Sequence, residues 1–221
     1  MPNWVYNSMN VSGEKTAVEQ FIADMSKPIQ TFKSDPDNKW GHLDGQWEEY
    51  ADVVFSFWNV IAPTDLEHYF TKENWYNWNI ASWGVKWDAK LDEKTVDQLD
   101  VITYADGKSG VSYHFETAWG APNEVFVALA EKYPHLEFDI EWEEEQGFGA
   151  ELSAVDGELS VVREWDIPSS HKDYVERDRE DSCICYYETD PEEMYDDCPP
   201  AIEANNDENK LVPVTELTSV S

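Results

Sequence analysis

Residues 136–143 alternate strictly between apolar and acidic side chains, the period of a β-strand with one buried face and one face in water. The apolar positions are Leu136, Phe138, Ile140 and Trp142, and the acidic positions are Glu137, Asp139, Glu141 and Glu143. Sheets with one solvated face are antiparallel as a rule, because parallel sheets are covered on both faces. We therefore expect an antiparallel sheet whose wet face carries a row of carboxylates.

Two segments carry apolar residues at the three- and four-residue spacing of a helix buried on one face. They are residues 14–25, with Val18, Phe21, Ile22 and Met25, and residues 121–134, with Val125, Phe126, Leu129 and Ala130. Further strands are expected at 3–11, 52–60, 95–105, 111–118 and on both sides of Asp156-Gly157, a favoured hairpin pair. This order is a repeated split β-α-β pattern. It predicts an α+β fold: a ferredoxin-like antiparallel sheet with two helices on one face and a C-terminal hairpin.

The chain is expected to contain one folded domain, residues 1–167, followed by an acidic extension, residues 168–221. Within the domain, residues 27–51 are interpreted as a long loop or insertion with room for short elements of structure, and residues 61–105 as an aromatic-rich insertion. The extension is expected to begin with a short charged helix at 171–180. It loses its periodicity and gains prolines beyond Asp190, so we predict a flexible tail after about residue 190.

The insertion holds four tryptophans within residues 74–89, where Trp75 and Trp78 fit one helical face and Trp83 and Trp87 fit a strand. Aromatic rings in such a cluster favour a buried core. The alternative is a ligand pocket, in which these four rings would stack on a nucleotide and Lys86 or Lys90 would contact its phosphate.

The charge balance excludes several classes of partner. There are 47 Asp and Glu against 15 Lys and Arg, which gives a net charge of −32 and an isoelectric point near 4.1. Such a chain repels phosphate backbones and anionic membranes, so direct nucleic-acid or membrane binding is not expected. Eleven Trp and 41% hydrophobic residues also exclude a disordered acidic chain. With no secretory signal and no membrane span in the sequence, we expect a cytoplasmic protein.

No catalytic motif is complete, so we predict a protein that is not an enzyme and needs no cofactor. Ser112 and His114 share one face of a strand but lack an identifiable orienting acid. Residues 35–45 resemble a calcium loop superficially, but Lys39 and Trp40 replace a ligand and the turn glycine. Residues 107–110 contain only the end of a phosphate-binding loop.

The three cysteines, Cys183, Cys185 and Cys198, fall within the last forty residues. A zinc site needs four ligands, and the five histidines (His42, His68, His114, His135 and His171) mostly lie far from them in the sequence. We therefore interpret the cysteines as reduced thiols and predict no metal site.

Three spaced motifs are Met1-Pro2-Asn3-Trp4 with Asn7 and Gly13, the block from Trp83 to Ala89, and Phe115 to Trp119 followed by Pro122 and Tyr133-Pro134. Together with Glu145-x-Gly147-Phe148-x-Ala150, they resemble a phage- and plasmid-encoded family with a YubB-type ferredoxin-like domain, over roughly residues 1–155. The chain departs from that pattern at Val5, where a cysteine is common, and at Gly120-Ala121. The resemblance implies the ferredoxin-like fold and an origin in a mobile element, and the family offers no agreed activity to carry over.

Acidity is thus the main functional signal of the sequence. Alternate carboxylates on a strand stand roughly 6.5 to 7 Å apart and can occupy a basic groove built for phosphates. We expect the chain to act as a DNA mimic that binds and inhibits a host protein. That host protein would have a basic surface and would serve in defence or in nucleic-acid handling. The expected contact residues are Glu137, Asp139, Glu141, Glu143, Glu144 and Glu145. One alternative is that the acidity only keeps the protein soluble, and the resemblance to mobile-element proteins favours host-protein binding over it. A second alternative is sequestration of a small ligand or nucleotide by the aromatic pocket.

Overall fold

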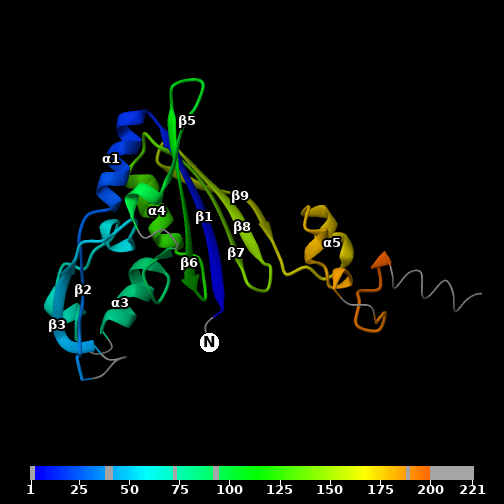
Figure 1. Cartoon of the computed structure of the whole chain (residues 1–221), viewed down its shortest axis with the longest axis horizontal. Coiled ribbons are helices and arrows are strands. Elements are labelled where there is room, and N and C mark those ends of the chain that lie inside the picture. The colour runs from blue at the N-terminus through cyan, green and yellow to red at the C-terminus, as the bar shows by residue number, and fades with distance from the viewer. Residues whose placement is uncertain (1–2, 38–41, 72–73, 92–94, 188–189, 200–221) are drawn as a thin grey trace, which may run out of the picture. The chain divides into compact units, whose positions relative to one another are not determined.

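A computed structural model describes residues 3–37, 42–71, 74–91, 95–187 and 190–199 of the chain. The chain divides into two compact units, residues 1–166 and residues 167–221 (Figure 1). Each unit is described by itself below.

The first unit is built on one large antiparallel sheet (Figure 1). Its strands follow the order β4-β6-β1-β7-β8-β9, and β5 also pairs with β6. The strands are β1 (Trp4–Gly13), β4 (Lys90–Leu91), β5 (Asp100–Thr103), β6 (Ser109–Ala118), β7 (Glu137–Glu144), β8 (Gly149–Val155) and β9 (Glu158–Trp165). The helices that pack on it are α1 (Lys15–Met25) and α4 (Asn123–Lys132).

The centre of this sheet has the ferredoxin-like arrangement. Strands β6 and β7 are joined through α4 and run parallel to each other, with β1 between them and antiparallel to both. The short strands β4 and β5 pair with successive parts of β6 and together form the fourth strand position. The hairpin β8-β9 then extends the sheet beyond β7. The predicted α+β fold is therefore confirmed at the level of an antiparallel sheet with a ferredoxin-like domain.

One face of the sheet is covered and the other is open. Side chains of α1 (Val18, Phe21, Met25) and α4 (Val125, Phe126, Leu129) share one buried cluster with alternate residues of β1, β6, β7 and β8. Both helices therefore lie on the same face, as the sequence predicts. The expected hairpin turn also forms, because Asp156 and Gly157 both adopt the positive φ angles, 53° and 86°, of a tight turn.

Two segments before residue 61 have structure that the sequence pattern did not define. Residues 27–51, interpreted as a long loop or insertion with short elements, contain a two-stranded hairpin, β2 (Ile29–Ser34) and β3 (His42–Tyr50). Residues 52–60, expected as a strand, form extended chain and a 3-10 turn, η1 (Phe57–Asn59). The apolar side chains of this segment are buried although the segment pairs with no strand among the described residues. They are Val53, Val54, Phe55 and Phe57.

The aromatic segment is helical over more of its length than predicted. A short helix, α2 (Leu66–Tyr69), begins at Asp65, whose side chain accepts a hydrogen bond from the His68 backbone N–H. The next helix, α3 (Asn74–Trp83), includes Trp83, which was expected on a strand. A 3-10 turn, η2 (Val96–Gln98), precedes β5. No helix in the described part of the chain has the length and apolar character that crossing a bilayer requires.

The second unit contains α5 (His171–Glu176) and the 3-10 turns η3 (Glu180–Ser182) and η4 (Ile184–Tyr186). Among the residues of this unit that the structure describes, the buried apolar cluster consists of Cys183, Met194 and Cys198, with Tyr174, Cys185 and Tyr195 packed against it. Two of these, Met194 and Cys198, belong to residues 190–199, which the sequence analysis placed in a flexible tail. The rest of that predicted tail lies outside the described residues.

Replacing Phe21 by alanine should lower the free energy of unfolding by about 3–5 kcal/mol. The ring is fully buried and meets Tyr113, Tyr133 and Phe138 edge-on, at centroid distances of 5.9, 5.1 and 5.8 Å. All eleven tryptophans lie in the first unit, so denaturant unfolding followed by tryptophan fluorescence reports on that unit alone. The exposed control Glu19→Ala on the same helix should change the value by less than about 0.5 kcal/mol. Equal effects of the two substitutions would contradict this packing.

Stability of the first unit should fall steeply above pH 10. Burial raises the pKa of Tyr69, Tyr113 and Tyr133 above the ordinary value of 10.0. The unfolded chain then releases protons that the folded chain retains, so stability is lost as the pH rises, by about 1.4 kcal/mol per pH unit for each tyrosine. A spectrophotometric titration should show these three ionising only as the fold is lost. Ionisation of all eleven tyrosines near pH 10 in intact protein would contradict it.

Candidate functional site

The predicted row of carboxylates lies on the open face of the sheet. Glu137, Asp139 and Glu141 are exposed, and Glu143 is half-buried. Directly opposite them on β1 stand Ser12, Asn10, Ser8 and Tyr6 in that order. Residues paired in this way point to the same face, so the polar face continues from β7 across β1. It also continues onto β6, where Ser112, His114 and Glu116 are the partners of β1.

Part of this acidity is balanced by nearby cations. Lys108 Nζ lies 3.2 Å from Glu137 Oε1, and this carboxylate raises the pKa of Lys108. Arg163 Nη2 lies 2.8 Å from Glu151 Oε1, and Lys90 pairs with Glu116. These pairs are exposed and individually weak.

A shallow groove of about 280 Å³ crosses the middle of the same face. Asp139, Glu141 and Glu151 line it together with the polar side chains of Ser8 and Asn10. Glu141 and Glu151 stand directly opposite each other on β7 and β8. Like charges in that relation repel each other, and Arg163 pairs with only one of the two. The groove therefore concentrates negative charge.

The two remaining acids of the predicted contact set are placed differently. Glu144 is only 3% exposed, and its Oε2 accepts a hydrogen bond of 2.6 Å from the Gln146 backbone N–H. It stabilises the turn between β7 and β8 and is not available to a partner, so its inclusion in the contact set was wrong. The break in alternation after Glu143 is the signal that could have shown this. Glu145 is exposed within the turn.

The aromatic pocket exists, and three of the four predicted rings line it. Trp75, Trp83 and Trp87 bound a cavity of about 230 Å³ together with Phe32 and Tyr69. Trp78 instead packs edge-on against Tyr69 and Trp83, at centroid distances of 5.3 and 5.4 Å. Trp83 itself is 2% exposed and donates to the Ile61 carbonyl, so its main role is in the core.

Asp88 lies at the edge of this pocket and fixes the chain around it. Its Oδ1 accepts from the backbone N–H groups of Phe57 (2.7 Å) and Ala89 (2.8 Å), and its Oδ2 accepts from the Ser56 hydroxyl (2.5 Å). Burial raises the pKa of Asp88, although these hydrogen bonds act in the opposite direction. The carboxyl group therefore links η1 to the segment that leads into β4.

The two lysines expected to meet a phosphate do not line the pocket; among the described residues that line it there is no Lys or Arg. Lys86 Nζ instead lies over the rings of Trp87 and Trp119, 4.4 and 5.1 Å from their centroids. Lys90 pairs with Glu116 and lies over Trp4. These are cation–π contacts on the outside of the unit.

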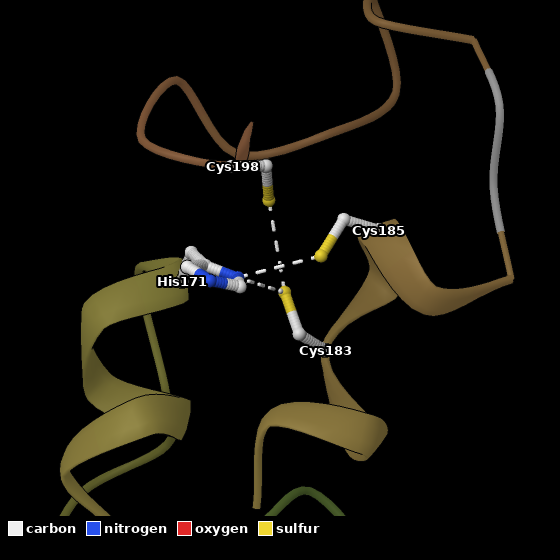
Figure 2. Close-up of side chains that lie close together, drawn as sticks. All are labelled: His171, Cys183, Cys185 and Cys198. Atoms are coloured by element: carbon white, nitrogen blue, oxygen red, sulfur yellow. Dashed lines mark hydrogen bonds between the residues drawn. The ribbon is translucent and has the colours of Figure 1, made fainter. Parts of the chain in front are cut away.

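The second unit brings together four side chains that the sequence analysis kept apart (Figure 2). His171 Nδ1 lies 3.3 Å from the sulfurs of both Cys183 and Cys185, and the sulfurs of Cys183 and Cys198 are 3.7 Å apart. One imidazole nitrogen and three sulfurs all lie within 4.8 Å of one another. Cys183 and Cys198 are fully buried, and His171 is 8% exposed.

Local structure positions these four groups. Ser170 caps α5 by accepting from the Asp173 backbone N–H, so His171 stands in the first turn of the helix. The carboxylate of Asp197 accepts from the backbone N–H groups of His171 (2.8 Å) and Lys172 (2.9 Å). Because Asp197 immediately precedes Cys198, these hydrogen bonds place Cys198 beside His171. The prediction of no metal site rested on the distance between His171 and the cysteines along the sequence. In the fold these four side chains nevertheless lie close together.

The three thiols differ in the direction in which their pKa is shifted. Burial acts to raise the pKa of Cys183, but hydrogen bonds from the Cys185 backbone and the His171 ring bring it below its ordinary value. Burial and the neighbouring sulfurs raise the pKa of Cys185 to about 12, and burial raises that of Cys198. Three thiolates so close together repel one another unless a cation lies between them.

Comparison with known proteins finds a family model to which part of the chain is similar. Residues 83–185 match the family described as "Ferredoxin-like domain in Api92-like protein". The match includes His171, Cys183 and Cys185, whereas Cys198 and strand β1 lie outside it. Among solved structures, the protein api92 from Yersinia pseudotuberculosis is similar at a TM-score of 0.42 and 10% identity, over 76% of this chain and 99% of that one. No curated protein matches the chain.

Replacing Asp88 by alanine should lower the free energy of unfolding of the first unit by about 3 kcal/mol, because two backbone N–H groups lose their acceptor. Asp88→Asn is the matched control: its amide oxygen can still accept both bonds, so the loss should stay below about 1 kcal/mol. Denaturant unfolding by tryptophan fluorescence measures both. If alanine and asparagine destabilise equally, the hydrogen bonds are not what Asp88 contributes.

Proposed function

We propose that this chain is a non-enzymatic accessory protein, encoded by a phage or plasmid, that binds and inhibits a host protein through the open acidic face of its main sheet. The contact surface consists of the groove residues Asp139, Glu141 and Glu151 and the flanking Glu137 and Glu143. The partner presents lysine and arginine side chains, as a surface built for nucleic-acid phosphates does. The resemblance to mobile-element proteins supports the origin.

The groove is the observation that carries this proposal. Glu141 stands directly opposite Glu151, and like charges paired across two strands lower the stability of a sheet. The pair is therefore not explained by a contribution to folding. Bound cationic side chains would relieve that repulsion. The surrounding serine and asparagine side chains of β1 supply hydrogen-bonding groups without adding positive charge. A face with this composition steers a basic partner and repels nucleic acid itself.

A second function, ligand sequestration by the aromatic pocket, has one observation in its favour: Trp75, Trp83 and Trp87 line a real cavity. Two others favour the acidic face. The cavity of about 230 Å³ is smaller than the roughly 300–1,000 Å³ typical of ligand sites. The described lining also contains neither lysine nor arginine to hold a phosphate. We therefore rank sequestration second.

Capture from bacterial lysate tests the proposal. The intact chain should retain a small set of basic proteins at about 0.1 M salt and lose them at about 1 M, where the screening length falls from about 10 Å to about 3 Å. The double variant Asp139→Asn/Glu141→Gln should retain at least about tenfold less of them.

The matched control is Glu48→Gln/Glu49→Gln on β3, which removes the same charge from exposed positions outside the main sheet. It should bind as the parent chain does. Equal losses in both variants would show that net charge alone, and not this face, holds the proteins. Release of a nucleotide from the purified chain on denaturation would favour sequestration instead.

A further inference from the structure

We propose that His171, Cys183, Cys185 and Cys198 form a structural zinc site that holds the second unit of the chain together. This site is independent of the acidic face and of the function proposed for it. Its ligand set, three thiolates and one imidazole, is one of the standard sets of structural zinc sites. The chemistry of soft sulfur ligands with one nitrogen also disfavours magnesium and calcium, which take oxygen ligands.

Three of the six distances between the four donor atoms are close to those of a tetrahedral zinc ion, and all four atoms lie within 4.8 Å of one another. Zinc–sulfur bonds of about 2.3 Å and zinc–nitrogen bonds of about 2.0–2.1 Å place neighbouring donors about 3.5–3.8 Å apart. The Cys183 and Cys198 sulfurs lie 3.7 Å apart, and His171 Nδ1 lies 3.3 Å from each of its two sulfur neighbours (Figure 2). A disulfide would require the sulfurs to approach to about 2.05 Å. The three cysteines are free.

The surroundings of the cluster are those of a metal site. His171 turns Nδ1 toward the sulfurs, while its Nε2 lies 3.8 Å from the Glu180 carboxylate. A carboxylate on this side of the ring can help to orient the imidazole with Nδ1 toward a metal. The backbone N–H groups of Cys185 and Tyr195 donate hydrogen bonds to the sulfurs of Cys183 and Cys198, as the groups around metal-bound sulfurs do.

The described part of the second unit buries few apolar side chains. Among its described residues, the buried apolar side chains are Met194 and two of the proposed ligands, Cys183 and Cys198. Units this small usually need disulfides, metal ions or association to fold. All four positions around the ion would be taken by protein atoms. The site is therefore closed, as structural zinc sites are, and offers no position for a catalytic water.

Cobalt binding to the full-length chain provides the test. The chain, reduced and stripped with a chelator, should bind one Co²⁺ with the strong visible absorption of a tetrahedral ion and a sulfur-to-cobalt charge-transfer band. Zn²⁺ should displace the cobalt. Loading with zinc should also slow the reaction of all three thiols with Ellman's reagent and slow proteolysis within residues 167–199.

Four variants separate this site from unspecific binding by the acidic chain. Cys183→Ser and His171→Ala should each weaken zinc binding at least about 100-fold. Glu180→Gln should weaken it about 10–100-fold, the usual effect of losing a residue that orients a metal ligand. His135→Ala, an exposed histidine of the first unit, should leave it unchanged. Tryptophan fluorescence verifies that the first unit stays folded in each variant.

Three results would overturn the proposal. The first is the weak spectrum of octahedral cobalt without a charge-transfer band, which would place the ion on carboxylates. The second is equal zinc affinity in Cys183→Ser, His171→Ala and the parent chain. The third is a Cys183–Cys198 disulfide in the chain as isolated without reductant or chelator.

Discussion

The pairing of β1 with both of its neighbours determines how the first unit is organised. Over its whole length β1 pairs with β6, and residues 5–12 pair with β7. This register places Val5, Met9 and Val11 under the helices and sends Ser8 and Asn10 to the opposite face. A slip of one residue would exchange the two faces, bury the carboxylates of β7 and expose its apolar side chains. The acidic face and the core therefore depend on the same set of backbone hydrogen bonds.

Those elements whose side chains follow a regular period could be predicted from the sequence. Strand β7 alternates because one side meets the core and the other meets water, and α1 and α4 carry their apolar residues on one stripe for the same reason. Residues 53–57 have no such period, because apolar side chains there are buried on every side without belonging to a strand. A prediction from hydrophobicity alone therefore assigns such a segment to a strand.

The histidine–cysteine cluster shows a second limit of sequence reasoning. His171 lies twelve residues before Cys183 and joins it only because Asp197 and Ser170 anchor the start of α5 beside Cys198. The two hydrogen bonds to Asp197 join residues about 25 positions apart, and no local sequence pattern predicts them. The Cys-x-Cys spacing was visible, but its histidine partner was not. Structural zinc in zinc-finger peptides contributes about 10–16 kcal/mol, which is ample for a unit with so small an apolar core.

The central claim is that the open face of the sheet, and not net charge in general, is the binding surface. Carboxylate footprinting tests it most directly: a water-soluble carbodiimide labels exposed acids, and mass spectrometry compares the chain alone with the chain bound to its captured partner. Protection should fall on Asp139, Glu141 and Glu151, while Glu48 and Glu49 stay labelled as in the free chain. Unchanged labelling of the three groove carboxylates in the complex would contradict the account.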